Sequence, residues 1–110
     1  GFFELMDEKE DMVISGGFNI YPSDLEAVLR QHPDVADVAV VGVASADWGE
    51  TPVAFVVSRG ADAETLRAFV NERVGKTQRI SDVRLIDELP RSHIGKILKR
   101  ELRDIYAATA

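Results

Sequence analysis

The chain has 110 residues, of which 45% are hydrophobic, so it can bury the core of one domain but is too short for two ordinary domains. It contains no cysteine, which excludes disulfides, thiolate metal sites and cysteine nucleophiles and fits a reducing cytosol, where we expect the protein. A formal net charge of −6 argues against bulk affinity for nucleic acid, and no apolar run is long enough to span a bilayer.

The first predicted elements are a β-hairpin and a helix. Short apolar runs at residues 2–6 and 12–15 flank a charged stretch, which is the pattern of a hairpin. A helix is predicted from Pro22 onward, because Ser23 and Glu26 match the S-x-x-E capping box, in which each side chain satisfies a backbone N–H at the helix start.

The rest of the chain predicts a sheet with further helices. Two buried strands separated by a loop, a helix capped by Asp62, a short strand and a final amphipathic helix are expected at residues 35–43, 53–58, 62–74, 83–86 and 96–106. The predicted fold class is therefore α+β: a small domain with a β-hairpin and a three-stranded sheet, covered by about three helices.

A basic segment near the C-terminus contains the first candidate site residue, Lys96. Residues 91–103 hold five basic side chains and one acidic one, so an anionic ligand should prefer this segment. Within the stretch LPRSHIGKILKREL, Lys96 follows Gly95 at the predicted start of the last helix, where backbone N–H groups attract anions. A lysine there suits a phosphate or carboxylate oxygen, but from spacing alone a solvated surface lysine is the more frequent case.

Three other positions have both a functional and a structural interpretation. Gly16 and Gly17 leave bare backbone beside which a thin ligand could pass, or they simply mark a turn. Trp48, in a polar loop, could stack on a base or pack over a strand edge. Arg79 could contact a phosphate or remain solvated. Neither histidine has a partner pattern for metal or triad chemistry, so no metal site is expected in this chain.

Four stretches together resemble, in the right order, the C-terminal domain of adenylate-forming enzymes: DMVISGGFNIYPSDLEAVL, HPDVADVAVVGV, WGE and ELPRSHIGKILKREL. Within that superfamily they look like acyl-CoA synthetases, especially fatty-acyl-CoA ligases. The resemblance covers nearly the whole chain, and Pro-Arg-x-x-x-Gly-Lys is its most specific motif. It implies that residues 1–110, which begin without a methionine, are a mobile domain cut from a longer chain whose N-terminal adenylation domain is absent here.

The resemblance implies a two-step reaction. A carboxylic acid, expected to be a long- or medium-chain fatty acid, reacts with ATP and Mg²⁺ to give an acyl-adenylate and pyrophosphate. CoA then displaces AMP to give the thioester. In the family the small domain swings between two poses over the adenylation domain, which holds most of the Mg²⁺ contacts. The isolated domain is expected to be inactive.

The resemblance also assigns roles to residues. Lys96 is expected to contact the substrate carboxylate and the α-phosphate of ATP during adenylation. The paired glycines are expected to let the pantetheine arm of CoA pass against bare backbone, Trp48 to lie near the CoA nucleotide and Arg79 near the CoA phosphates. The expected cofactor-binding residues are Gly16, Gly17, Trp48, Arg79 and Gly95.

The stretch at residues 7–11 departs from the family pattern Asp-Arg-x-Lys-Asp. Glu8 stands where relatives carry an arginine that helps hold the nucleotide ribose, and the interdomain hinge is expected at Glu10 and Asp11. A glutamate facing ATP repels its phosphates. This departure motivates a second hypothesis, a binding module that has lost catalysis. A third is a nucleic-acid or membrane binder that uses the basic segment at residues 91–103.

Overall fold

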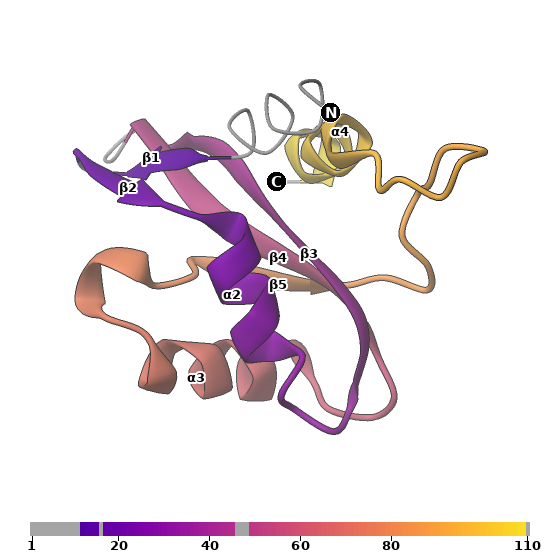
Figure 1. Ribbon diagram of the computed structural model, residues 1–110, viewed down its shortest axis with the longest axis horizontal. Helices are drawn as coiled ribbons and strands as arrows, with labels where there is room; N and C mark the ends of the chain where they lie inside the picture. The colour runs from indigo at the N-terminus through magenta and orange to yellow at the C-terminus, as the bar shows by residue number, and fades with distance from the viewer. Residues whose placement is uncertain (1–11, 16, 46–48, 110) are drawn as a thin grey trace.

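The computed structural model describes residues 12–15, 17–45 and 49–109 (Figure 1). Their elements follow in chain order: β1 (Val13–Ser15), β2 (Phe18–Ile20), α2 (Pro22–Leu29), β3 (Val35–Ser45), β4 (Gly49–Ser58), α3 (Ala63–Arg73), the 3₁₀ helix η1 (Lys76–Gln78), β5 (Asp82–Leu85) and α4 (Lys99–Thr109). The predicted small α+β domain is confirmed by this arrangement. None of the helices within the described ranges is long and apolar enough to cross a membrane.

β4 is the central strand of the sheet. On one side it pairs antiparallel with β3 along nearly its whole length, and on the other side it pairs in parallel with β5. The hairpin of β1 and β2 joins the same sheet through a single pair, Ser15 with Gly49. Among the described strands β3 is thus the last on its side of the sheet, and its outer edge accepts side chains from the helices.

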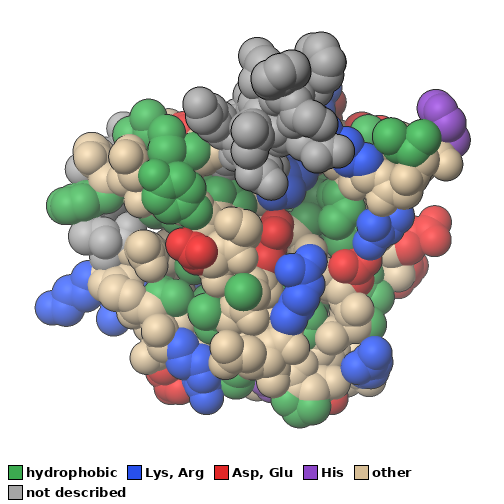
Figure 2. All heavy atoms as spheres, viewed as in Figure 1, with side chains coloured by type: hydrophobic (Ala, Val, Ile, Leu, Met, Phe, Trp, Pro, Cys, Tyr) green, Lys and Arg blue, Asp and Glu red, His purple; other side chains and the backbone are tan. Residues whose placement is uncertain are grey.

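Helices cover both faces of the sheet. Side chains alternate between the two faces along a strand, so neighbouring residues of β3 enter different clusters. Val38 and Val40 pack in one cluster with residues of α2 and α3. Ala39 and Val41 pack in a second cluster with Leu102 of α4. On the outside, Figure 2 shows Lys and Arg side chains interspersed with Asp and Glu side chains.

Most predicted strands are confirmed, as are the helix starts at Pro22 and directly after Asp62. The predicted strands at residues 35–43, 53–58 and 83–86 correspond to β3, β4 and β5, although β3 and β4 extend into much of the predicted loop between them. Asp62 is the N-cap of α3, and its carboxylate accepts a hydrogen bond of 2.8 Å from the backbone N–H of Thr65.

The hairpin differs from the prediction. The strand expected at residues 12–15 pairs with β2, directly across the turn that contains Gly17, whose φ of +84° favours glycine. β2 was not predicted, because three residues directly after paired glycines are too few to show an alternating pattern. The predicted partner at residues 2–6 lies outside the described residues.

The capping-box prediction is wrong. The N-cap of α2 is Tyr21, which makes no side-chain cap, and Pro22 occupies the first turn, so Ser23 already lies inside the helix. Proline suits that position because its missing N–H needs no partner there. Glu26 does not reach back to the helix start. It is 9% exposed and binds β3 and α4 instead.

Candidate functional site

Lys96 lies in a tight turn and not at a helix N-terminus. The predicted helix start at Lys96 is wrong, since α4 begins at Lys99. Arg91 and Ile97 form an antiparallel bridge. Next to this bridge, the Ser92 N–H donates a hydrogen bond of 2.8 Å to the Lys96 carbonyl. Gly95 closes the turn with φ +88°. The N-terminus of α4 therefore lies three residues beyond Lys96, and the charge of Lys96 is carried by the loop.

The loop that carries Lys96, residues 90–98, is tied down at both ends. At its start Arg91 forms an ion pair with Asp37 of β3, and its Nη1 also donates to the Gly95 carbonyl at 3.0 Å. At its end the Leu98 N–H donates to the Pro90 carbonyl at 2.9 Å, which closes the loop on itself. The exposed turn is thus held by backbone and charged contacts.

A buried carboxylate, that of Glu26, contacts Lys99, the residue that directly follows this loop. Glu26 Oε2 accepts a hydrogen bond of 2.8 Å from the Val40 N–H and lies 3.1 Å from Lys99 Nζ. Both side chains are mostly buried, with 12% and 16% of their surface exposed. No local pattern predicts this contact, because the spacing of Glu26 from Ser23 fits a capping box and Lys99 lies on a helix far away in the sequence.

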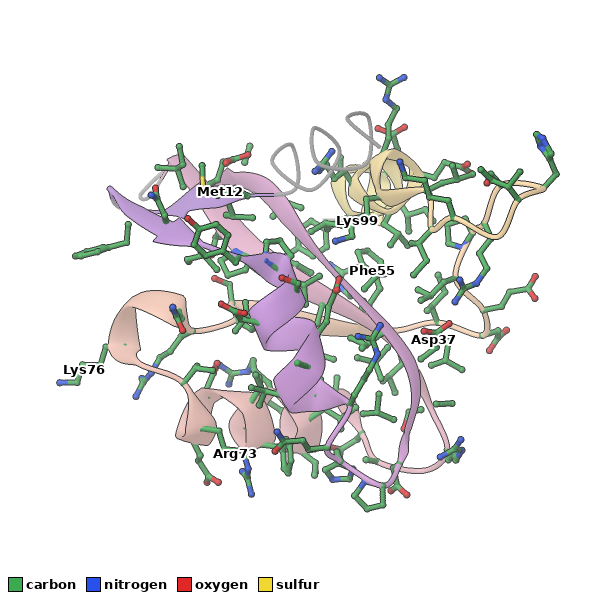
Figure 3. The ribbon with its side chains drawn as sticks, viewed as in Figure 1. Met12, Asp37, Phe55, Arg73, Lys76 and Lys99 are labelled. Carbon is green, nitrogen blue, oxygen red and sulfur yellow. The ribbon has the colours of Figure 1, made fainter. Side chains whose placement is uncertain are left out.

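The remaining predicted site residues fall into two groups. Gly17, at the hairpin turn, and Arg79, just after η1, are both exposed, and η1 contacts β2. Figure 1 shows the hairpin and η1 on one side of the molecule and the loop of Lys96 on the opposite side. Lys76, labelled in Figure 3, projects from the η1 end. Gly16, Trp48, Glu10 and Asp11 lie outside the described residues, as does Glu8.

A surface hollow of about 590 Å³ lies between β3, the start of β4 and α4, and its described lining includes none of the predicted site residues. Tyr106 lies on its wall and donates a hydrogen bond of 3.2 Å from its hydroxyl to Asp82. Burial, followed by the nearby Asp82 carboxylate, raises the pKa of the Tyr106 phenol. The described part of the chain has no cluster of three or more histidines, aspartates or glutamates that could hold a metal.

Comparison with known proteins identifies the family. The AMP-binding enzyme C-terminal domain family matches residues 24–96, which is most of the described fold. This chain therefore belongs to that family. The matched segment ends at the lysine that the Pro-Arg-x-x-x-Gly-Lys motif had singled out.

The proteins similar to this chain include CoA ligases. The chain is 45% identical to a 2-succinylbenzoate–CoA ligase of Geobacillus kaustophilus over 99% of its own length, and 43% identical to a long-chain-fatty-acid–CoA ligase of Escherichia coli over 94%. It also superposes on ATP-bound MatB from Rhodopseudomonas palustris with a TM-score of 0.84 and 37% identity over 89% of its length. It spans only 23%, 19% and 20% of these three proteins.

Proposed function

We propose that this chain is the C-terminal domain of an ATP-dependent acyl-CoA synthetase and that it supplies the adenylation lysine, Lys96. The observation that carries the proposal is the position of Lys96, exposed on a closed turn that Arg91 ties to the sheet. A cation presented in this way can enter the active site of another domain. The relatives are CoA ligases of which this chain matches only about a fifth, which supports a larger partner domain in the same polypeptide.

The chemistry of adenylation needs such a cation. The substrate carboxylate must approach the α-phosphate of ATP, and both groups are negatively charged. A fixed ammonium group in a site without water offsets this repulsion most strongly when charge is redistributed in the transition state. Lys96 needs no proton-transfer step for this role. The adenylation domain would hold ATP and its Mg²⁺.

The second half-reaction would use the other end of the domain. Gly17 and Arg79 lie on the side of the hairpin, away from Lys96 (Figure 1). A single pose could not bring both ends to one active site, so their separation supports alternation between an adenylation pose and a thioester-forming pose.

In the second pose Gly16 and Gly17 would line the path of pantetheine, while Trp48 and Arg79 would approach the CoA nucleotide. The hinge would lie at Glu10 and Asp11.

The acyl group is proposed to be a long- or medium-chain fatty acid. The similarity to a long-chain-fatty-acid–CoA ligase supports this choice. The similarity to a 2-succinylbenzoate–CoA ligase, at 45% against 43% identity, supports an aromatic acid as the second candidate. The acid would bind in the adenylation domain, so assays of the full-length polypeptide with both kinds of acid distinguish the two candidates.

The test follows the two half-reactions separately in the full-length polypeptide. Lys96→Ala should lower ATP- and acid-dependent pyrophosphate release by roughly 100-fold or more, the size of effect seen when one transition-state donor is lost. Thioester formation from pre-made acyl-adenylate and CoA should survive. Lys76→Ala, which removes an exposed lysine at the opposite end, should leave pyrophosphate release unchanged.

Two outcomes would contradict the proposal. Unchanged rates of both half-reactions in Lys96→Ala would make Lys96 an ordinary surface charge. A full-length polypeptide that forms no thioester with any acid would instead support the binding-module hypothesis suggested by Glu8.

A further inference from the structure

We propose that Arg91 and Lys99 are positioning residues, which fix the loop of Lys96 to the outer edge of β3 through Asp37 and Glu26. The inference rests on the proposed function, because it concerns how Lys96 is presented. It adds two residue pairs that join the loop to segments far away in the sequence.

Arg91 acts on the peptide group directly before Lys96. Its Nη1 donates to the Gly95 carbonyl at 3.0 Å, while its Nη2 pairs with an oxygen of Asp37. One planar guanidinium therefore connects the turn to β3. Its two donor groups have a fixed relative geometry, so the position of one partner constrains the other. A lysine, with a single ammonium group, could not hold both partners in this way.

Lys99 acts from the other end of the loop. Its Nζ lies 3.1 Å from Glu26 Oε2, the same oxygen that accepts the Val40 N–H. One edge of β3 pairs with β4. The Val40 N–H donates to the Glu26 side chain and not to β4, so it points to the opposite, outer edge of β3. α2 covers one face of the sheet and α4 the other, so the Lys99–Glu26 pair crosses this edge between them. Lys99 is labelled in Figure 3.

Both contacts are needed because the turn between them has little packing of its own. Residues 93–96 are exposed, and Ile94 keeps 79% of its surface in contact with solvent. Asp37 and Val40 lie only three positions apart on β3, so one short stretch of the strand edge fixes both ends of the loop. Lys96 has a long flexible side chain, and its reach is defined only if the backbone that carries it is fixed.

The experiment uses the full-length polypeptide with Arg91→Gln, Lys99→Met and the double variant Glu26→Gln/Lys99→Met. If these residues position Lys96, the kcat of pyrophosphate release should fall about 10- to 100-fold, as expected for a small displacement of a catalytic group. The KM for ATP and the rate of thioester formation from acyl-adenylate should stay within about twofold. The double variant removes both buried charges, so it tests the contact even if Lys99→Met alone folds poorly.

Combination with Lys96→Ala separates positioning from general damage. In that background Arg91→Gln should cause no further loss of pyrophosphate release, because the group that it positions is already absent. In the Arg91→Gln variant, the backbone amides of residues 90–98 should exchange hydrogen faster than in the wild-type chain, while exchange elsewhere in the domain should stay unchanged. Arg67→Gln is the matched control, since it removes an exposed ion pair with Glu64 on α3.

The outcomes distinguish the two proposals. If Lys96→Ala abolishes pyrophosphate release but Arg91→Gln and the Lys99 variants keep full activity, the positioning role is wrong and the proposed function stands. If Arg91→Gln lowers activity equally with and without Lys96, its effect is structural and the positioning role is again wrong. If Lys96→Ala itself has no effect, both proposals fail.

Discussion

Asp62 illustrates how a single side chain sets the start of a helix. Its backbone is extended, with φ −84° and ψ +170°, and its carboxylate accepts the Thr65 N–H at 2.8 Å. This hydrogen bond satisfies one of the N–H groups that the first turn of every helix leaves without a backbone partner. Hydrogen bonds from Thr65, first from its side chain and then from its backbone, lower the pKa of Asp62.

The lowered pKa of Asp62 gives a prediction for pH dependence. Asp62→Ala should lower the midpoint of urea unfolding at neutral pH. The unfolded carboxyl titrates at about 3.9 and the folded one lower, so the contribution of Asp62 is present above about pH 4 and is lost as the pH falls through the folded pKa. The difference between the midpoints of the wild-type chain and Asp62→Ala should therefore become smaller in acid.

The control for this prediction is Asp62→Asn. Asparagine keeps an acceptor oxygen at the N-cap and cannot titrate, so the difference between Asn and Ala at this position should persist in acid. A difference between the wild-type chain and Asp62→Ala that stays constant from neutral to acid pH would show that the ionised carboxylate does not support the helix.

At the scale of elements, Gly42 decides how the hairpin meets β3. A Cβ placed on Gly42 would lie 2.8 Å from Cγ2 and 3.3 Å from Cγ1 of Val13, which belongs to β1 and is almost fully buried. Val13 is short and branched and is packed in the main core cluster, so it cannot move aside easily. The missing side chain at position 42 thus allows the hairpin to pack close to β3.

Gly42→Ala should destabilise the chain by about 1–3 kcal/mol, as expected when an extra carbon is forced into a packed core. Equilibrium urea unfolding measures this loss. Gly75→Ala is the matched control, because φ at Gly75 is −69° and no atom lies within 4 Å of an added Cβ. It should change stability by less than about 0.5 kcal/mol. Equal effects of the two substitutions would mean that Val13 yields to the added carbon.

The elements differ in how well their sequence predicts them. β3 and β4 are long and rich in valine, so their pattern is clear. β2 has three residues and follows two glycines, which is too little for a periodic signal. The start of α4 was predicted three residues early because Ile97 and Leu98 fit the helical spacing of apolar residues. The bridge between Ile97 and Arg91 keeps Ile97 and Leu98 out of the helix, and this bridge depends on tertiary contacts.

At the scale of the whole molecule, the candidate site depends on contacts that sequence cannot reveal. Lys96 is predictable as a candidate site residue because it belongs to a recognisable local motif. The contact between Arg91 and Asp37 is not predictable, because the two residues are 54 positions apart and no local pattern links them. Glu26 was misassigned for a related reason: its spacing from Ser23 fits a capping box, but Tyr21 is the N-cap and the Glu26 carboxylate binds the Val40 N–H of β3.

The Glu26–Lys99 pair should also stabilise the domain as a whole, because it links α2 on one face of the sheet to α4 on the other. Lys99→Met leaves the Glu26 carboxylate mostly buried without its ion-pair partner. It should cost about 3 kcal/mol, the low end for a buried pair, since both side chains keep some contact with water. In Glu26→Gln/Lys99→Met both charges are gone, so the loss should be smaller than the sum of the single losses, with a coupling of about 1–3 kcal/mol.

Urea unfolding of the wild-type chain, the two single variants and the double variant measures this coupling. The parallel cycle at Glu64 and Arg67, an ion pair with side chains 66% and 43% exposed, should show no measurable coupling, because water and side-chain entropy cancel most of the attraction. If both cycles give the same value, burial at the edge of β3 adds nothing to the Glu26–Lys99 pair. If the coupling is large for Glu26 and Lys99 but not for Glu64 and Arg67, the contact proposed to position Lys96 also links the helices on the two faces of the sheet.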